Sequence, residues 1–351
     1  MNPTDKYFEF LKKLENETPD SIMTNLFDKN WKNLLEKQKG TGANWFTLKP
    51  FDKVDPILLP ILAKDPLVSA CYLYYLIYST TSALSERKDD ILNDEKVKNF
   101  LKMSLDTIKT NSWACYVLIS IRFSFHKVAV FEQYRSEFEN IIAKDCAASY
   151  YYALGDFYKE NSDKKESIRP KDNGRFRLGE PVILNSGYWS YYYAKHILKN
   201  RWNEAEDSIS KETRKIDNVL FTALYAREFI KGKWIEAEPN ISKHGISSLH
   251  YAQTINKEFP EGENEISKNP QLAFDYSKLI NKEFKLGENA ISTNPQLSFN
   301  YARDILNGRF ELGEPSIMTD PDLTLQYAVE VVRGKLPEDM HNAMIGKKLA
   351  A

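Results

Sequence analysis

The sequence has few of the residues on which catalytic and metal sites usually depend. Its 351 residues include three cysteines and five histidines. Cys71, Cys115 and Cys146 lie far apart in apolar surroundings and form no CxxC pair, so we interpret them as reduced, buried side chains rather than disulfide partners or metal ligands. The chain has no HExxH, GxSxG, phosphate-binding or dinucleotide-binding motif. The motifs therefore give no support to an enzyme, and we expect no metal and no cofactor.

The chain also lacks an excess of charge of either sign and a convincing membrane segment. A net charge of −1 argues against a dedicated nucleic-acid binder. Residues 66–85 carry no charge, but serine, threonine and tyrosine interrupt them, which favours a buried helix over a membrane span. The N-terminus lacks the apolar core of a signal peptide. We therefore predict a cytoplasmic protein without a membrane segment.

The sequence does contain one motif that is repeated six times within residues 174–340, at intervals of 25 or 26 residues except in the second copy. Each repeat has an aromatic residue, a Glu four positions later, an Ile three after that, and then a Tyr. The aromatic residues of repeats 1 to 6 are Phe176, Trp202, Trp234, Phe259, Phe284 and Phe310. The tyrosines are Tyr193, Tyr225, Tyr251, Tyr276, Tyr301 and Tyr327. Repeat 2 carries six extra residues between Ile209 and Tyr225.

Helix-capping residues, prolines and glycines at fixed positions predict two helices in each repeat. A capping residue before a proline starts the longer helix at Asn269-Pro270, Asn294-Pro295 and Asp320-Pro321. A proline after the repeated Glu suits the first turn of a shorter helix. Glycines at 232, 308 and 334 would supply left-handed helix stops. With no strand signal, the predicted fold is all-α, an α-solenoid of stacked short helix–turn–helix repeats.

Composition and weakly similar copies of the same motif divide the rest of the chain into segments. We expect N-terminal helices and a loop in residues 1–55, with helices over 4–15 and about 20–37. Residues 56–160 are interpreted as diverged helical repeats, because Leu62 and Ile142 each precede a tyrosine by ten positions and share an Ala-Lys-Asp core. Residues 161–173 form a polar linker, and residues 341–351 a C-terminal tail.

The amino-acid sequence of the repeats resembles that of a known repeat type. The stretches that begin Tyr225-Ala-Arg-Glu-Phe-Ile and Tyr301-Ala-Arg-Asp-Ile-Leu both continue through Gly-Lys-Trp or Gly-Arg-Phe to Glu-Pro. They are similar to repeats of about 25 residues in uncharacterised proteins of large tailed bacteriophages and other large DNA viruses. The resemblance covers residues 173–345 and implies a viral protein, acting in the host cytoplasm. It implies no enzymatic motif.

For the repeated apolar and acidic residues, a structural role competes with a chemical one. A unit of two short helices cannot bury its own apolar face, so we expect its aromatic residues to pack between neighbouring repeats. The predicted core residues are Trp202, Tyr225, Trp234, Tyr251, Tyr276, Tyr301 and Tyr327. The glutamates could form a carboxylate ladder for metal binding or acid–base chemistry. Because each stands at a helix start, we predict helix capping instead.

Basic residues two positions after the tyrosine are the candidate binding surface. They are Lys195, Arg227, Lys278 and Arg303, which we call the basic row. Stacked repeats would align them, and such a row could bind phosphates or an acidic protein surface. A solvated face with no ligand is the alternative.

Three functions compete on this evidence. The first is a non-enzymatic scaffold that binds a protein partner, in a viral setting a host factor or a virion component. The second, disfavoured by net charge, is a repeat-based RNA or single-stranded DNA binder that uses the basic row. The third is an enzyme with an unrecognised site in residues 1–160.

Overall fold

A computed structural model describes residues 54–83, 94–119, 131–155 and 174–333, with the single residues Thr24, Phe51, Glu338, His341 and Asn342. The described part is mostly helical, in agreement with the all-α prediction. The predicted helices over 4–15 and 20–37, the linker 161–173 and the tail 341–351 lie outside the described residues, apart from single positions. The chain divides into two compact units, Met1–Asn185 with Lys195–Lys199, and Ser186–Ala194 with Asn200–Ala351.

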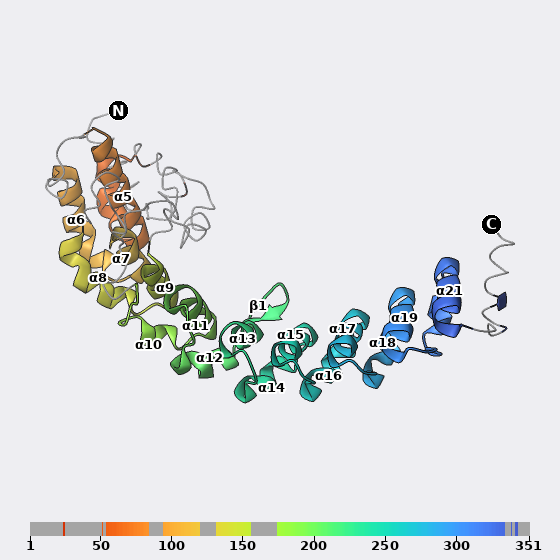
Figure 1. Ribbon diagram of the computed structural model, residues 1–351. Helices are drawn as coiled ribbons and strands as arrows, with labels where there is room; N and C mark the ends of the chain where they lie inside the picture. The colour runs from red at the N-terminus through yellow and green to blue at the C-terminus, as the bar shows by residue number, and fades with distance from the viewer. Residues whose placement is uncertain are drawn as a thin grey trace, which may run out of the picture. The chain divides into compact units, whose positions relative to one another are not determined.

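The first unit is a group of packed helices (Figure 1). They are η2 (Pro56–Leu58), α4 (Leu59–Leu62), α5 (Pro66–Ala83), α6 (Glu95–Ile108), α7 (Ser112–Ile119), η4 (Glu132–Tyr134), α8 (Arg135–Ile142), α9 (Cys146–Leu154) and α10 (Glu180–Ile183). Helix α5, the segment predicted as a buried helix, packs against α6 and α7, and α7 packs against α8. Among the described helices, none combines the length and the apolar character needed to cross a bilayer.

Helices α5, α7 and α9 share one construction at their starts. An Asp or Asn side chain accepts the backbone N–H three residues later, at 2.7–2.9 Å; these capping residues are Asp65, Asn111 and Asp145. Four residues after each cap, a Ser or Cys donates to the backbone carbonyl seven residues before it; these donors are Ser69, Cys115 and Ser149. Ser248, Ser298 and Thr324 make the same bond in the second unit. Leu62 and Ile142, the residues that carried the faint sequence likeness, are two of the acceptors.

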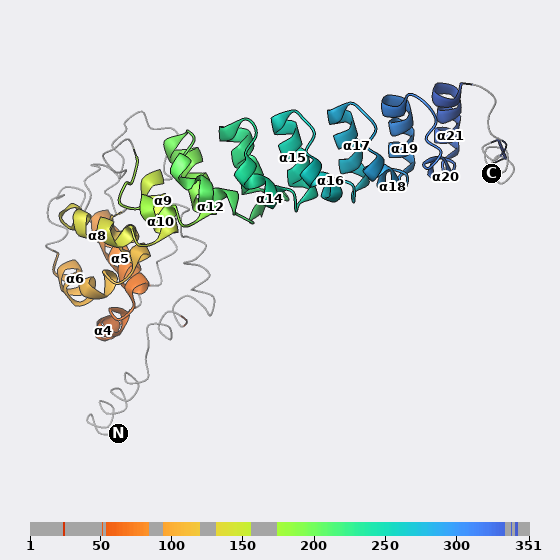
Figure 2. The same ribbon diagram turned by 90° about the horizontal axis from the view of Figure 1, so that it is seen from below.

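In the second unit, short and long helices alternate along the chain (Figures 1 and 2). The long helices are α11 (Gly187–Tyr193), α13 (Phe221–Tyr225), α15 (Gly245–Ile255), α17 (Pro270–Ile280), α19 (Pro295–Tyr301) and α21 (Pro321–Tyr327). Helices α11, α13, α19 and α21 are counted as long together with the π-helical turn that continues each of them. The short helices are α12 (Glu206–Ser210), α14 (Glu238–Ile241), α16 (Pro260–Ile266), α18 (Glu288–Ile291) and α20 (Glu314–Ile317). Single 3-10 turns, η6 (Asn203–Ala205), η8 (Ile235–Ala237) and η9 (Lys285–Gly287), lead into α12, α14 and α18.

Each long helix from α11 to α21 contacts the next long helix of the second unit. The starts of three of them follow the predicted chemistry, since Asn269, Asn294 and Asp320 accept backbone N–H groups of the first turn. A proline then occupies the first turn, where its missing N–H costs no helical hydrogen bond. Close packing of successive repeats lets a side chain of one repeat reach the next, as Arg303 does with Glu330 at 3.5 Å.

The ends of the long helices differ from the prediction. Four of them finish in a π-helical turn, η5 (Ala194–Leu198), η7 (Ala226–Ile230), η10 (Ala302–Leu306) and η11 (Ala328–Val332). The left-handed residues are Lys231, with φ of 56°, and Asn307, with φ of 48°, not the glycines that follow them. The third predicted stop, residue 334, lies outside the described residues. In η7 and η10 the N–H of the left-handed residue reaches the alanine carbonyl five residues back, so the helix closes one position before the glycine.

The prediction that the chain has no strand was wrong at the insertion in repeat 2. Strands β1 (Lys215–Ile216) and β2 (Val219–Leu220) pair antiparallel, Lys215 with Leu220 and Ile216 with Val219. Asp217 and Asn218 connect them with φ of 49° and 64°. Two left-handed residues in a two-residue loop suit a type I′ hairpin turn, and Asp and Asn tolerate that conformation.

Candidate interaction surface

The repeated tyrosine hydroxyl is the centre of an internal hydrogen-bond network. In repeats 2 to 6 it accepts the backbone N–H of the aromatic residue of the same repeat, at 2.7–2.9 Å. In repeats 3 to 6 it also donates to the repeated Glu, thirteen residues earlier, at 2.8–3.1 Å. Tyr327, for example, lies between the N–H of Phe310 and the carboxylate of Glu314. Both hydrogen-bonding functions of the hydroxyl are therefore used inside the repeat.

The repeated glutamates were predicted to cap helices, and this prediction has to be corrected. Five of the six stand at the first position of their short helices, and Glu263 is the fourth residue of α16. Their carboxylates, however, accept from the tyrosine hydroxyl in repeats 3 to 6 and pair with a basic side chain in repeats 1, 2, 3, 5 and 6. Both oxygens of Glu314 accept from Arg309, at 2.8 Å each, and Glu314 is only 5% exposed. These carboxylates are structural partners and do not form an open ladder for metal or acid–base chemistry.

Aromatic rings link one repeat to the next. The tyrosine ring of one repeat contacts the aromatic ring of the following repeat, with centroids 4.9–5.4 Å apart in five successive pairs. All seven residues predicted for the core are buried: Trp202, Tyr225, Trp234, Tyr251, Tyr276, Tyr301 and Tyr327. Burial disfavours the phenolate and raises the pKa of Tyr225 to about 12. The side chains that define the repeat are thus used in stacking it.

All four members of the basic row, Lys195, Arg227, Lys278 and Arg303, are exposed. Lys195 lies in the first unit, and the other three lie in the second. The Arg303 guanidinium lies 4.9 Å from the ring centroid of Phe299, and the Lys278 ammonium 5.6 Å from that of Phe274. Their stems therefore cover buried aromatic rings, which is a packing role for two of the four residues.

Acidic side chains largely neutralise the basic row in the second unit. Arg303 pairs with Asp304 at 2.6 Å and with Glu330 of the next repeat at 3.5 Å. Arg227 pairs with Glu228 at 3.8 Å. Arg227 and Arg303 thus have acidic partners, whereas Lys278 makes no ion pair among the described residues. A phosphate backbone needs an excess of positive charge, and this surface does not supply one.

A second exposed surface was missed by the sequence reasoning. It lies on the long helices of repeats 4 to 6, at the positions two and six residues after the helix cap. These residues are Gln271, Asp275, Gln296, Asn300, Asp322 and Gln326, and we call them the amide row. Gln271, Gln296, Asp322 and Gln326 are exposed, while Asp275 and Asn300 are half-buried. The spacing of four residues from the proline-marked helix starts was the available signal.

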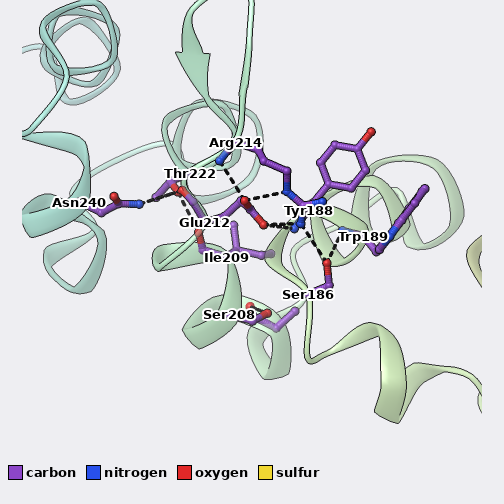
Figure 3. Close-up of polar contacts among 10 residues, drawn as sticks. Ser186, Tyr188, Trp189, Ser208, Ile209, Glu212, Arg214, Thr222 and Asn240 are labelled. Carbon is purple, nitrogen blue, oxygen red and sulfur yellow. Dashed lines mark hydrogen bonds and ion pairs between the residues drawn. The ribbon is translucent and has the colours of Figure 1, made fainter. Parts of the chain in front are cut away.

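Figure 3 shows a polar cluster around the buried Glu212, where the hairpin of repeat 2 leaves α12. The Glu212 carboxylate, in a residue 9% exposed, accepts from the backbone N–H of Tyr188 at 2.8 Å and from the Arg214 guanidinium at 2.8 and 2.9 Å. The Arg214 guanidinium also lies 4.1 Å from the centroid of the Tyr188 ring. Burial opposes ionisation of Glu212, but hydrogen bonds from Arg214 and Tyr188 outweigh it and lower its pKa.

The Asn240 amide anchors the other side of this cluster. It donates to the backbone carbonyls of Ser210 and Glu212, at 3.1 and 2.9 Å, and lies 3.3 Å from the Thr222 hydroxyl. Repeat 3 therefore holds the insertion of repeat 2 in place. Because every polar group named here has a partner inside the cluster, we interpret it as structural.

The described residues contain no group of three or more His, Cys, Asp or Glu side chains placed to hold a metal ion. Cys71 and Cys115 are buried, and Cys146 is half-buried. Burial raises the pKa of the Cys115 thiol to about 12, so it is a poor nucleophile. Comparison of the chain with family models, with curated proteins and with solved structures gave no match.

Proposed function

We propose that this protein is a non-enzymatic interaction scaffold, an α-solenoid of helical repeats that holds a protein partner on its exposed long-helix face. One observation carries the proposal. The residues that recur in every repeat are used internally, in the network of tyrosine, glutamate and aromatic N–H. The exposed positions instead change from repeat to repeat. Constant inner residues with varied outer residues are what a stacked-repeat binding surface requires.

The varied outer positions follow a trend along the chain. Two and six residues after the helix cap stand Tyr188 and Tyr192 in repeat 1, Ile246 and His250 in repeat 3, and the amide row in repeats 4 to 6. In repeat 2 the corresponding residues, Thr222 and Ala226, are buried and interrupt this surface. This gradation from aromatic to polar side chains offers different contacts to different parts of one long partner. The resemblance to viral repeats adds a setting to the proposal, in which the partner is a host factor or a virion component.

The competing proposal, an RNA or single-stranded DNA binder, has less support. Such binding needs positive charge along the array. Two of the three basic-row residues in the second unit, Arg227 and Arg303, already pair with Glu228, Asp304 and Glu330. Neutral electrostatics favours a protein partner over a polyphosphate one.

The test is a pull-down with the tagged full chain from its native cells at physiological salt, with protein and nucleic acid both measured in the eluate. We expect one protein in stoichiometric amount, retained when the salt concentration is doubled. Nucleic acid that is lost on doubling the salt, without a protein, would support the competing proposal. An eluate that holds neither, under several growth conditions, would contradict the scaffold.

A further inference from the structure

We propose that the amide row of repeats 4 to 6 binds the main chain of an extended, basic peptide segment. This rests on the proposed scaffold function and specifies the chemistry of its partner. Carboxamides carry the same donor and acceptor groups as a peptide bond, so they can bind a backbone whatever its side chains.

The hydrogen bonds within the row decide what it presents. Gln296 Nε2 donates to Asn300 Oδ1 at 3.1 Å. This bond leaves the Gln296 Oε1 acceptor and the Asn300 Nδ2 donor for a ligand, which are the complements of a peptide N–H and C=O. Gln271 Nε2 makes the corresponding bond to Asp275 Oδ1, also at 3.1 Å. Two adjacent repeats thus hold an amide side chain in the same arrangement.

The spacing of the helices suits an extended chain. Helices α17, α19 and α21 contact one another in order and lie side by side (Figures 1 and 2). Packed helices lie about 8–10 Å apart. A polyproline II chain rises about 3.1 Å per residue with three residues per turn, roughly 9 Å per turn. One turn per repeat would bring an equivalent backbone group to each helix, over about nine residues for three repeats.

The charge of the row selects a basic partner. Asp275 and Asp322 belong to it, and its six positions include no Lys or Arg. An acidic row repels the phosphates of a nucleic acid, so recognition of nucleobases by the same amide side chains is disfavoured. It attracts lysine or arginine side chains that flank the bound backbone. A helical partner is excluded by a different argument, since its backbone groups already bond one another.

The experiment uses the full chain and an array of N-acetylated, C-amidated 12-residue peptides of random sequence. We expect the bound peptides to be enriched in Lys or Arg. The dissociation constant of the strongest one, measured by fluorescence anisotropy, should rise about tenfold in the double variant Gln296→Ala, Asn300→Ala, since two hydrogen bonds to the ligand are lost. Methylation of central backbone nitrogens in that peptide should weaken binding similarly.

The matched control is the double variant Asn264→Ala, Asn289→Ala. It removes two exposed asparagines from the short helices α16 and α18, away from the amide row, and should leave the constant unchanged. No enriched peptide, equal loss in both double variants, or no loss in either would overturn the inference. If the pull-down retains its protein while Gln296→Ala, Asn300→Ala changes nothing, the scaffold stands and only this inference fails.

Discussion

The backbone N–H of Phe310 donates a 2.8 Å hydrogen bond to the hydroxyl of Tyr327, seventeen residues later in the same repeat. The same separation joins Trp234 to Tyr251, Phe259 to Tyr276 and Phe284 to Tyr301. In repeat 2 the separation is 23, because the insertion adds six residues without disturbing the bond between Trp202 and Tyr225. The bond fixes the turn before each short helix to the long helix that follows it.

Replacement of Tyr276 by Phe should destabilise the second unit by about 1–3 kcal/mol. The change removes only the hydroxyl, but it leaves the buried N–H of Phe259 without an acceptor and Glu263 without its donor. The measurement is the midpoint of urea unfolding, followed by circular dichroism. The control is Tyr188→Phe, because the Tyr188 hydroxyl has no hydrogen-bond partner among the described residues. Equal urea midpoints for the two variants would contradict the proposal that the tyrosine hydrogen bonds stabilise the second unit.

Alkaline pH should unfold the repeats. Burial raises the pKa of Tyr225 to about 12 and raises that of Tyr251, Tyr276, Tyr301 and Tyr327 further. An unfolded tyrosine loses its proton near pH 10. Between these values the folded state binds more protons than the unfolded state, so stability falls as pH rises. The urea midpoint should be constant from pH 8 to about 9.5 and fall above pH 10. A midpoint that stays flat to pH 11.5, far above about 10, would contradict this.

Gly313→Ala should destabilise the junction of repeats 5 and 6 by roughly 1–3 kcal/mol. An added Cβ there would lie 2.3 Å from Phe310 Cδ1 and 2.7 Å from Ser298 Cβ, closer than packed atoms approach. The matched control is Gly232→Ala, where an added Cβ meets no atom within 4 Å. We expect thermal unfolding at lower temperature for the first variant only. A stable Gly313→Ala protein would show that this contact can relax.

Glu212→Gln should destabilise the insertion and make the protein less sensitive to acid. The lowered pKa of Glu212 means that its stabilising effect is present above its ordinary value of 4.5 and is lost as pH falls through the folded value. At neutral pH the neutral amide gives Arg214 a weaker acceptor, so the urea midpoint should fall. Between pH 5 and about 3 the midpoint should fall less steeply than in the unchanged protein. The control is Glu204→Gln at an exposed position, which should match the unchanged protein throughout.

Local chemistry in the sequence determined the helices and their starts. Asn269, Asn294 and Asp320 cap as predicted, since a capping side chain bonds an N–H two or three residues away and needs no tertiary contact. The period of the motif also predicted which aromatic residues would be buried. Signals that act over a few residues can be read directly from the chain.

Only the tertiary structure decided how the charged residues are used. The Glu314 carboxylate accepts a hydrogen bond from the hydroxyl of Tyr327, thirteen residues later. Arg303 forms an ion pair with Glu330, 27 residues later, in the next repeat. Sequence spacing places residues on a helix face, but their partners are set by the packing of one helix on another. Glu228 and Asp304 directly follow Arg227 and Arg303 in the sequence, whereas the pair between Arg303 and Glu330 could be found only in the structure.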